Sequence, residues 1–215
     1  MRRFRRKYYD LFSTVYDRFV AMHSSDGQGL VRRYLAEKTG LGPGERVLDI
    51  CTGTGAVLSP LSEKVGPRGM AVGIDFSQGM LRKAKERSGG RPPAFLVLGD
   101  AGRLPFKEGI FHVVTCAHAF YELRGRAQDR CLREVGRVLR PGGCFLMLEH
   151  DVPKRRVPRL LFYLRLLSMG RERAIAILRH EGEILSRYFP RVSRLRTPTG
   201  RSKIMRCSEG RPGSR

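Results

Sequence analysis

Three aspartates in this sequence stand at or near the ends of short apolar runs, and their side chains offer the most specific chemistry in the chain. They are Asp49, Asp75 and Asp100, and the runs cover residues 46–51, 70–75 and 94–98. Short apolar runs bounded by glycine and proline are typical of buried strands. In an open parallel sheet, ligands bind beyond the carboxyl ends of the strands. The sequence therefore predicts a ligand site bordered by carboxylates at one edge of a sheet.

A glycine turn follows the first of these runs and narrows the class of ligand. The turn is Gly53-Thr54-Gly55, without the third glycine that a dinucleotide fingerprint places three positions later. A carboxylate at Asp49 would repel phosphate and favour a group that carries ammonium or sulfonium charge. Asp75 lies 20 residues after Gly55, the distance at which an acidic side chain receives ribose hydroxyls. These residues predict a ribose-bearing, cationic nucleoside without phosphate, and S-adenosylmethionine fits that description.

Each aspartate alone also has a structural explanation. Asp49 can cap a turn, and Asp75 and Asp100 can cap the helices that follow them. The occurrence of all three acids at successive strand ends, beside a glycine turn, favours donor binding over three unrelated caps.

The elements that must position these residues alternate between strand and helix. Two further apolar runs predict strands over residues 111–117 and 144–149. The predicted helices cover residues 56–65, with a proline in the first turn, 77–87 and 126–139. We expect Pro141-Gly142-Gly143 to turn the chain into the fifth strand. Strands separated by helices imply right-handed crossovers and a parallel sheet. Beyond residue 150, the expected elements are a helix over 173–189 and a hairpin of 192–196 with 202–207.

Four motifs in order along the chain carry a resemblance to a known family. They are VLDICTGTG at 47–55, GIDFSQGML at 73–81, GDAGRLPF at 99–106 and VLRPGG at 138–143, preceded by FSTVYD at 12–17. With these motifs the chain resembles the class I S-adenosylmethionine-dependent methyltransferases, most closely the ubiquinone/menaquinone C-methyltransferases. The resemblance covers residues 10–150 well and the rest weakly.

The fold that this resemblance implies is an α/β, Rossmann-like three-layer sandwich. Its seven-stranded sheet is mostly parallel, in the order 3-2-1-4-5-7-6, with an N-terminal helical lid. We expect a single methyltransferase domain over residues 1–215. Residues 1–40, whose aromatic residues recur at helical spacing, would form the lid. Residues 41–150 would form the donor-binding core, and residues 151–215 the substrate cover helices and the terminal hairpin.

The resemblance also implies which residues bind the donor. They are Asp49, Cys51, Thr52, Gly53, Thr54, Gly55, Asp75, Phe76, Met80, Asp100, Ala101, Ala117 and His118. Asp75 would bind both ribose hydroxyls, and Asp100 and Ala101 would meet the adenine. Ala117 and His118 would form the floor near the methyl group. Two departures stand out: Cys51 replaces the glycine of many relatives, which predicts a tighter loop, and Ala117 replaces a frequent serine, which removes a hydrogen bond.

Methyl transfer from a sulfonium is an in-line displacement that asks little acid–base chemistry of the protein. The protein positions the acceptor roughly 3–3.5 Å from the methyl carbon and excludes water. A base is needed only where the acceptor loses a proton. The candidates near the fourth and fifth strand ends are His118, His150, Tyr121 and Glu122, and Tyr16 on the lid is a further catalytic candidate. Histidine suits the role because it titrates near neutrality, although a single histidine is more often a packed or surface residue.

The chain is strongly basic, with 42 Lys+Arg, 20 Asp+Glu and a formal net charge of +22. Such a surface attracts phosphate backbones, anionic lipids or acidic metabolites, but the charge is dispersed and an arginine-rich composition explains it equally well. Residues 153–170 mix cations with leucines. They predict either an amphipathic helix in a membrane interface or a cover that packs over the acceptor pocket.

Four functions remain open at this point. The acceptor can be a quinone precursor or similar lipophilic aromatic, a phospholipid headgroup or a nucleic acid, or the chain can be a donor-binding scaffold without activity. The nucleic-acid alternative is weaker because the fourth strand lacks a following Asn/Asp-Pro-Pro-aromatic signature.

The remaining expectations concern location, metal and cysteines. No run reaches the roughly 18 apolar residues of a membrane span, and the basic N-terminus has no apolar stretch of a secretory signal. We therefore expect a cytoplasmic protein, peripheral to an anionic membrane in the lipid alternatives. The five cysteines lack zinc-ligand spacing, so we expect reduced thiols and no metal.

Overall fold

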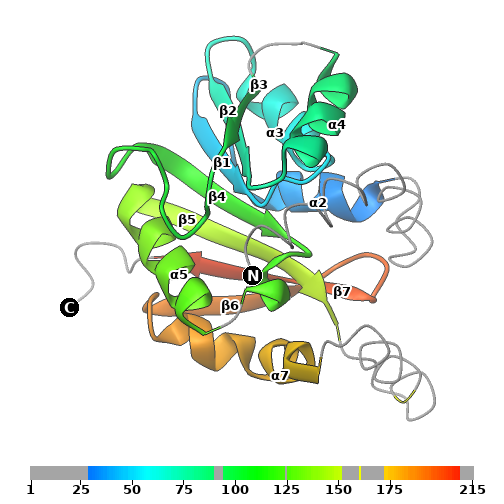
Figure 1. Cartoon of the computed structure of the whole chain (residues 1–215), viewed down its shortest axis with the longest axis vertical. Helices are drawn as coiled ribbons and strands as arrows, with labels where there is room; N and C mark the ends of the chain where they lie inside the picture. Colours follow the sequence, from blue (N-terminus) through cyan, green and yellow to red (C-terminus); the bar gives the residue numbers. More distant parts are fainter. Residues whose placement is uncertain (1–28, 90–93, 124, 152–159, 161–171, 209–215) are drawn as a thin grey trace.

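One seven-stranded sheet organises the molecule. The computed structural model describes residues 29–89, 94–123, 125–151, 160 and 172–208. The strand order is β3-β2-β1-β4-β5-β7-β6 (Figure 1), as the family resemblance implies. The strands are β1 (Arg46–Ile50), β2 (Met70–Asp75), β3 (Ala94–Leu98), β4 (Phe111–Ala117), β5 (Leu139–His150), β6 (Arg191–Arg196) and β7 (Ser202–Ser208). The first five are parallel, and β7 pairs antiparallel with both β5 and β6.

Helices pack on both faces of this sheet. They are α2 (Leu30–Lys38), α3 (Leu58–Val65), α4 (Gln78–Ser88), α5 (Arg126–Val138) and α7 (Glu172–Ser186), with a 3-10 turn η1 (Phe120–Glu122). Two separate core clusters account for the layers. One joins residues of α2 and α3 to one face of the sheet, and the other joins residues of α5 and α7 to the opposite face. The three-layer architecture follows from these two cores.

Strand alternation decides which side chains lie on the face covered by α2 and α3. Val47 belongs to the cluster of α2 and α3, whereas Leu48 and Ile50 belong to the cluster of α5. Successive side chains of a strand point to opposite faces, so Asp49 lies on the same face as Val47. Its partner in register on β4 is Thr115. A polar pair is thereby placed under α2 and α3, next to the carboxyl ends of the strands.

The predicted ends of β2, β3 and β4 agree with the structure, but the predicted start of β5 was wrong. The expected turn at residues 141–143 is instead an irregularity within β5. Phe111 pairs with Leu139, and Val113, two residues later, already pairs with Cys144, so the extra residues of β5 bulge out of the pairing. Gly143 permits the close return: a Cβ there would lie 2.9 Å from the Arg140 oxygen.

The C-terminal hairpin is tied to α7 by a buried ion pair. Lys203 on β7 pairs with Glu181 on α7, and its Nζ also donates to the Leu178 oxygen at 2.8 Å. The hairpin itself was predicted, and Thr197 closes its turn by donating to the Ser202 oxygen at 2.6 Å.

Several predicted features lie outside the described residues. These are residues 1–28 of the expected lid, including Tyr16, and the basic segment 153–170 apart from Leu160. Within the described ranges no helix is long and apolar enough to span a bilayer. All five cysteines are described and carry free thiols.

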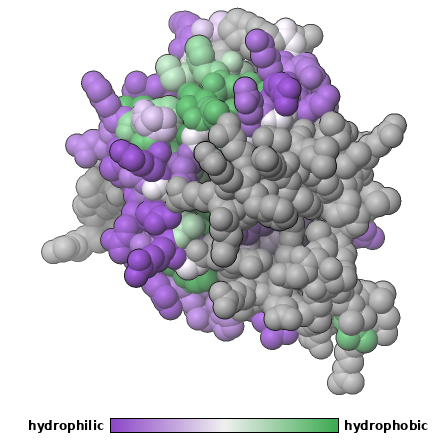
Figure 2. Space-filling model, in the orientation of Figure 1, coloured by the Kyte–Doolittle hydropathy of each residue, from purple (hydrophilic) through white to green (hydrophobic). Residues whose placement is uncertain are grey.

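The surface of the viewed face is polar over most of its described part (Figure 2). An apolar patch lies near β3, the edge strand, where Phe95 and Leu98 are 54% and 49% exposed. This patch is separate from the site described next, because none of its residues lines the pocket there.

Candidate donor-binding site

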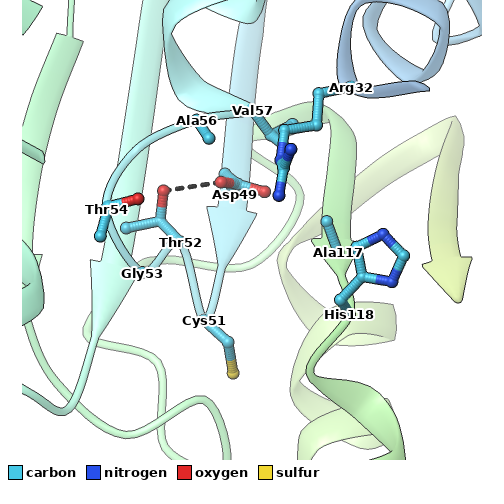
Figure 3. A pocket seen from close by; sticks show the side chains of 10 residues that line it. All are labelled: Arg32, Asp49, Cys51, Thr52, Gly53, Thr54, Ala56, Val57, Ala117 and His118. Atoms are coloured by element: carbon cyan, nitrogen blue, oxygen red, sulfur yellow. Dashed lines mark hydrogen bonds between the residues drawn. The ribbon is translucent and has the colours of Figure 1, made fainter. Parts of the chain in front are cut away.

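A pocket lies between the loop that follows β1, the end of β4 and the Arg32 side chain of α2 (Figure 3). The space between its walls is about 380 Å³, and part of that space is open to solvent. The residues that line it are Arg32, Asp49, Cys51, Thr52, Gly53, Thr54, Ala56, Val57, Ala117 and His118. Seven of these ten are among the thirteen donor-binding residues expected from the sequence.

Asp49 is the acid of this pocket, and two hydroxyls hold it. Thr52 Oγ1 donates to its Oδ2, and Thr115 Oγ1 donates to its Oδ1, each at 2.6 Å. The residue is 1% exposed. Burial raises the pKa of Asp49 to about 6, against the lowering effect of the two hydroxyl hydrogen bonds, and the charge of Asp75 raises it further. The carboxylate is therefore oriented and gains from any cation that enters the pocket.

Asp75 connects the glycine turn to the following helix. Its Oδ2 accepts from the Gly53 amide and its Oδ1 accepts from the Ser77 amide, both at 2.9 Å. Ser77 then caps α4, because its hydroxyl accepts from the Met80 amide at 3.2 Å. Each carboxylate oxygen retains acceptor capacity beyond one amide. The predicted ribose-binding acid thus also fixes the turn in the loop between β1 and α3.

Two glycines allow the loop to pack as tightly as it does. A Cβ on Gly55, whose φ is +73°, would lie 3.0 Å from the Ala84 Cβ of α4. A Cβ on Gly73 of β2 would lie 2.9 Å from the Thr52 hydroxyl that holds Asp49. Side chains at these positions would push the loop away from the acid that it orients.

The backbone is strained at two residues of the pocket. Cys51 and His118 are the described non-glycine residues with positive φ, and each has a φ of 53°. They follow β1 and β4, which are adjacent strands. Left-handed backbone at such residues is uncommon and clusters at functional sites. Cys51 thus adopts a backbone conformation that glycine prefers.

His118 is a buried imidazole at the β4–β5 side of the pocket. It is 8% exposed, and in the described structure neither ring nitrogen has a hydrogen-bond partner. Its ring lies 4.5 Å from that of His150, and the Tyr121 ring lies 6.0 Å from His150. Burial holds the pKa of His118 well below its ordinary 6.5, and the charges of His150 and Arg32 lower it further. The imidazole is therefore neutral at pH 7, and its surroundings disfavour the protonated form.

The remaining predicted residues do not line this pocket. Asp75 accepts from the Gly53 amide but does not itself line the pocket. Met80 and Ala101 are buried, and Phe76 is partly buried. Asp100 is exposed and accepts from the Gly102 amide at 2.9 Å within its own turn. These residues stay a prediction for the nucleoside end of the donor, on the side of β2 and β3.

The sequence analysis missed Arg32. The residue sits beside the buried face of α2, since Val31, Leu35 and Ala36 are all buried. A basic residue three and four positions before buried residues lies at the margin of a packed helix face. That spacing indicates a partly buried arginine, but only the fold shows that its side chain lines the pocket.

The residues of the site fit the donor predicted from the sequence. Held carboxylates and hydroxyls surround the glycine turn, and Asp75 occupies the Gly53 amide that a phosphate-binding turn would offer to its ligand. The two acids, Asp49 and Asp75, suit a cationic nucleoside. Among the described residues, no group of three or more histidine, cysteine or acidic side chains is arranged to hold a metal ion.

Comparison with known proteins points to one family. Residues 47–143 match the family described as a methyltransferase domain. The chain is 35% identical over 152 residues to demethylmenaquinone methyltransferases from several strains of Staphylococcus aureus. The match includes 71% of this chain and 62% of those proteins, so the chain spans less than two thirds of their length.

Solved structures show the same fold at low sequence identity. A S-adenosylmethionine-dependent methyltransferase from Aquifex aeolicus superposes with a TM-score of 0.66 at 21% identity, over 85% of this chain and 92% of its own. The CMeT domain of the citrinin polyketide synthase superposes with a TM-score of 0.62 at 22% identity, over 80% of this chain and 48% of that chain. Sheet order and relatives agree: residues 47–143 match a methyltransferase domain, and the chain is similar to S-adenosylmethionine-dependent methyltransferases, among them demethylmenaquinone methyltransferases.

Proposed function

We propose that this chain transfers a methyl group from S-adenosylmethionine to a small lipophilic acceptor that must lose a proton, such as a quinone precursor. The observation that carries the proposal is the acid-bordered glycine turn, held by Asp49 and Asp75, with a neutral histidine at its edge. The similarity to demethylmenaquinone methyltransferases supports this class of acceptor.

The donor, when bound, supplies a methyl group on a positively charged sulfur. Asp49 then faces the cationic end, and Asp75 receives the ribose hydroxyls. Because the loop is already fixed by Thr52 and by the Gly53 amide, little ordering is needed when the donor enters. The residues at the end of β4 lie across the pocket from this loop (Figure 3), where the acceptor would approach in line with the sulfur–methyl bond.

His118 is the proposed base. An aromatic carbon that gains a methyl group loses its proton, and a hydroxyl that is methylated loses its own. Either proton needs an acceptor once per turnover, and a neutral imidazole without an internal partner can take it. His150 and Tyr121, which lie beside His118, would border the acceptor.

An acceptor panel tests this function. Purified protein with methyl-labelled S-adenosylmethionine is given a reduced hydroxynaphthoquinone, phosphatidylethanolamine vesicles or total RNA. We expect label in the naphthoquinone. Transfer only to the lipid, transfer only to RNA, or donor binding without transfer to any acceptor would each contradict the proposal and favour one of the other three functions.

The base is tested with two histidine variants. His118→Gln should lower kcat by roughly 10²- to 10⁴-fold and change the affinity for the donor far less. His180→Gln is the matched control, because His180 is exposed on α7. Equal kcat in wild type and His118→Gln would remove His118 from the mechanism.

A further inference from the structure

We propose that Glu134 and Arg137 of α5 are positioning residues for the base of the donor. They hold the loop between β3 and β4, residues 99–110, in the conformation that presents Asp100 to that base. The inference rests on the proposed function, since it assumes that S-adenosylmethionine lies along the carboxyl edge of the sheet. It adds to that function two side chains, neither of which lines the pocket.

The order of the strands determines which loop meets the base. β1 lies between β2 and β4, and β3 lies beyond β2 at the edge of the sheet. With the methyl group at the end of β4 and the ribose at Asp75, which ends β2, the base extends further in the same direction, toward β3. The loop that follows β3 begins with Gly99 and Asp100, so the first turn of this loop borders the base.

That first turn orients the Asp100 carboxylate and packs closely on α5. Asp100 Oδ1 accepts from the Gly102 amide, and the Asp100 carbonyl oxygen accepts from the Arg103 amide, both at 2.9 Å. A Cβ on Gly102 would lie 3.3 Å from the Arg130 Cβ of α5. The direction of the carboxylate therefore depends on how the loop is held against this helix.

Glu134 and Arg137 bind the chain directly after this turn. Glu134 Oε2 accepts from the Leu104 amide at 2.7 Å. Arg137 Nη2 donates to the Leu104 oxygen at 3.1 Å, and its Nη1 donates to the Phe106 oxygen at 2.8 Å. Arg137 also donates to both carboxylate oxygens of Glu134, each at 2.7 Å. One two-point ion pair thus holds three backbone groups of the loop.

The spacing of residues on α5 explains why they reach the same loop. Arg130, Glu134 and Arg137 follow i, i+4, i+7 steps, which place them along one face of a helix. Leu132 is buried in the core on the same helix, which fixes the rotation of α5. The Arg137 guanidinium lowers the pKa of Glu134, against the raising effect of burial, and the Leu104 amide lowers it further. Glu134 therefore stays ionised at pH 7 and keeps its partner.

A comparison of two bases reports on the position of the Asp100 carboxylate. Adenine presents a 6-amino donor where hypoxanthine presents a 6-oxo acceptor, and an ionised carboxylate can only accept. Calorimetry on ligand-stripped protein compares S-adenosylhomocysteine with S-inosylhomocysteine, which differ only in the base. Wild type should bind the adenine compound at least about 10-fold more tightly.

Variants of the ion pair test whether it sets this preference for adenine. Arg137→Gln removes the guanidinium contacts to the loop, and the preference should fall at least about 5-fold. Arg137→Lys keeps the charge without the planar fork and should retain an intermediate preference. The exchange of Glu134→Arg with Arg137→Glu restores an ion pair on α5 but not the contacts to the loop. Its thermal stability should exceed that of Arg137→Gln, while its preference stays low.

Arg133→Gln is the matched control on the same helix. Arg133 pairs with Asp129 at 3.2 Å, so its replacement also removes an arginine–carboxylate pair from α5. The Arg133 side chain is 71% exposed, against 35% for Arg137, and its Nε donates to Asp129 rather than to the loop. This variant should keep the affinity and the adenine preference of wild type.

The outcomes separate this inference from the proposed function. Equal affinity of wild type for the two compounds would overturn the inference while leaving donor binding intact. An unchanged adenine preference in folded Arg137→Gln would also overturn it, because the ion pair would then serve the stability of the fold alone. If folded wild type binds neither compound, the proposed function fails together with the inference.

Discussion

Asp49 works against the stability of the fold at neutral pH. Its folded pKa is about 6, whereas an unfolded aspartate titrates near pH 3.9. The folded state therefore holds the proton more tightly, and stability falls as pH rises from about 4 through about 6, by roughly 3 kcal/mol for two pKa units. A buried acid that is kept despite this cost is expected at a ligand site rather than in a structural cap.

Replacement of Asp49 by asparagine should separate stability from binding. Asp49→Asn keeps hydrogen-bonding groups opposite Thr52 and Thr115 but cannot ionise. In urea titrations, its free energy of unfolding minus that of wild type should rise by about 2–3 kcal/mol between pH 3.5 and pH 8, while affinity for the donor falls. Parallel stability curves for the two proteins would show that Asp49 is not titrating with a raised pKa.

At the scale of elements, Glu149 at the end of β5 anchors the loop that follows β4. Its Oε1 accepts from the Phe120 amide of η1 at 2.8 Å, and in the described structure its Oε2 has no partner. Burial raises the pKa of Glu149 well above 4.5, and the charge of Glu181 raises it further. Burial thus favours the protonated form of this side chain, and its hydrogen bond to Phe120 positions the segment from His118 to Glu122.

A pair of substitutions tests this anchor. Glu149→Gln preserves the acceptor for Phe120 and should leave kcat and stability near wild type. Glu149→Ala leaves that amide buried without a partner, which should cost about 1–3 kcal/mol, and should lower kcat more than it lowers donor affinity. Thermal unfolding and steady-state kinetics measure both effects. If the glutamine variant is as impaired as the alanine variant, the side chain is required in its charged form.

How far the sequence predicted these elements depends on whether the signal is local. The β2, β3 and β4 strands are continuous apolar runs between breakers, and their ends agree with the structure. The start of β5 was missed because Pro141–Gly143 resembles a turn and only the pairing with β4 shows that the strand continues. The acids at the strand ends follow from the topology, whereas Arg32 needed the placement of α2 beside the pocket, which no local pattern encodes.

At the scale of the whole molecule, the net charge of +22 predicts attraction to anionic surfaces. In co-sedimentation, the protein should bind phosphatidylglycerol vesicles at low salt and be released near 0.5 M salt, because screening shortens the range of such attraction to about 4 Å. Uncharged vesicles are the control. Absence of binding to anionic vesicles at low salt would leave the arginine-rich composition without a role in membrane association.

The central claim is that carboxylates around a glycine turn select S-adenosylmethionine, and calorimetry tests it most directly. Ligand-stripped wild-type protein should release or absorb heat saturably, at one site per chain, with S-adenosylmethionine and with its demethylated product. Asp75→Ala should bind both at least about 10-fold more weakly. Ser77→Ala, which removes the cap of α4, should bind nearly as wild type. No heat from folded wild type, or unchanged affinity in Asp75→Ala, would contradict the account.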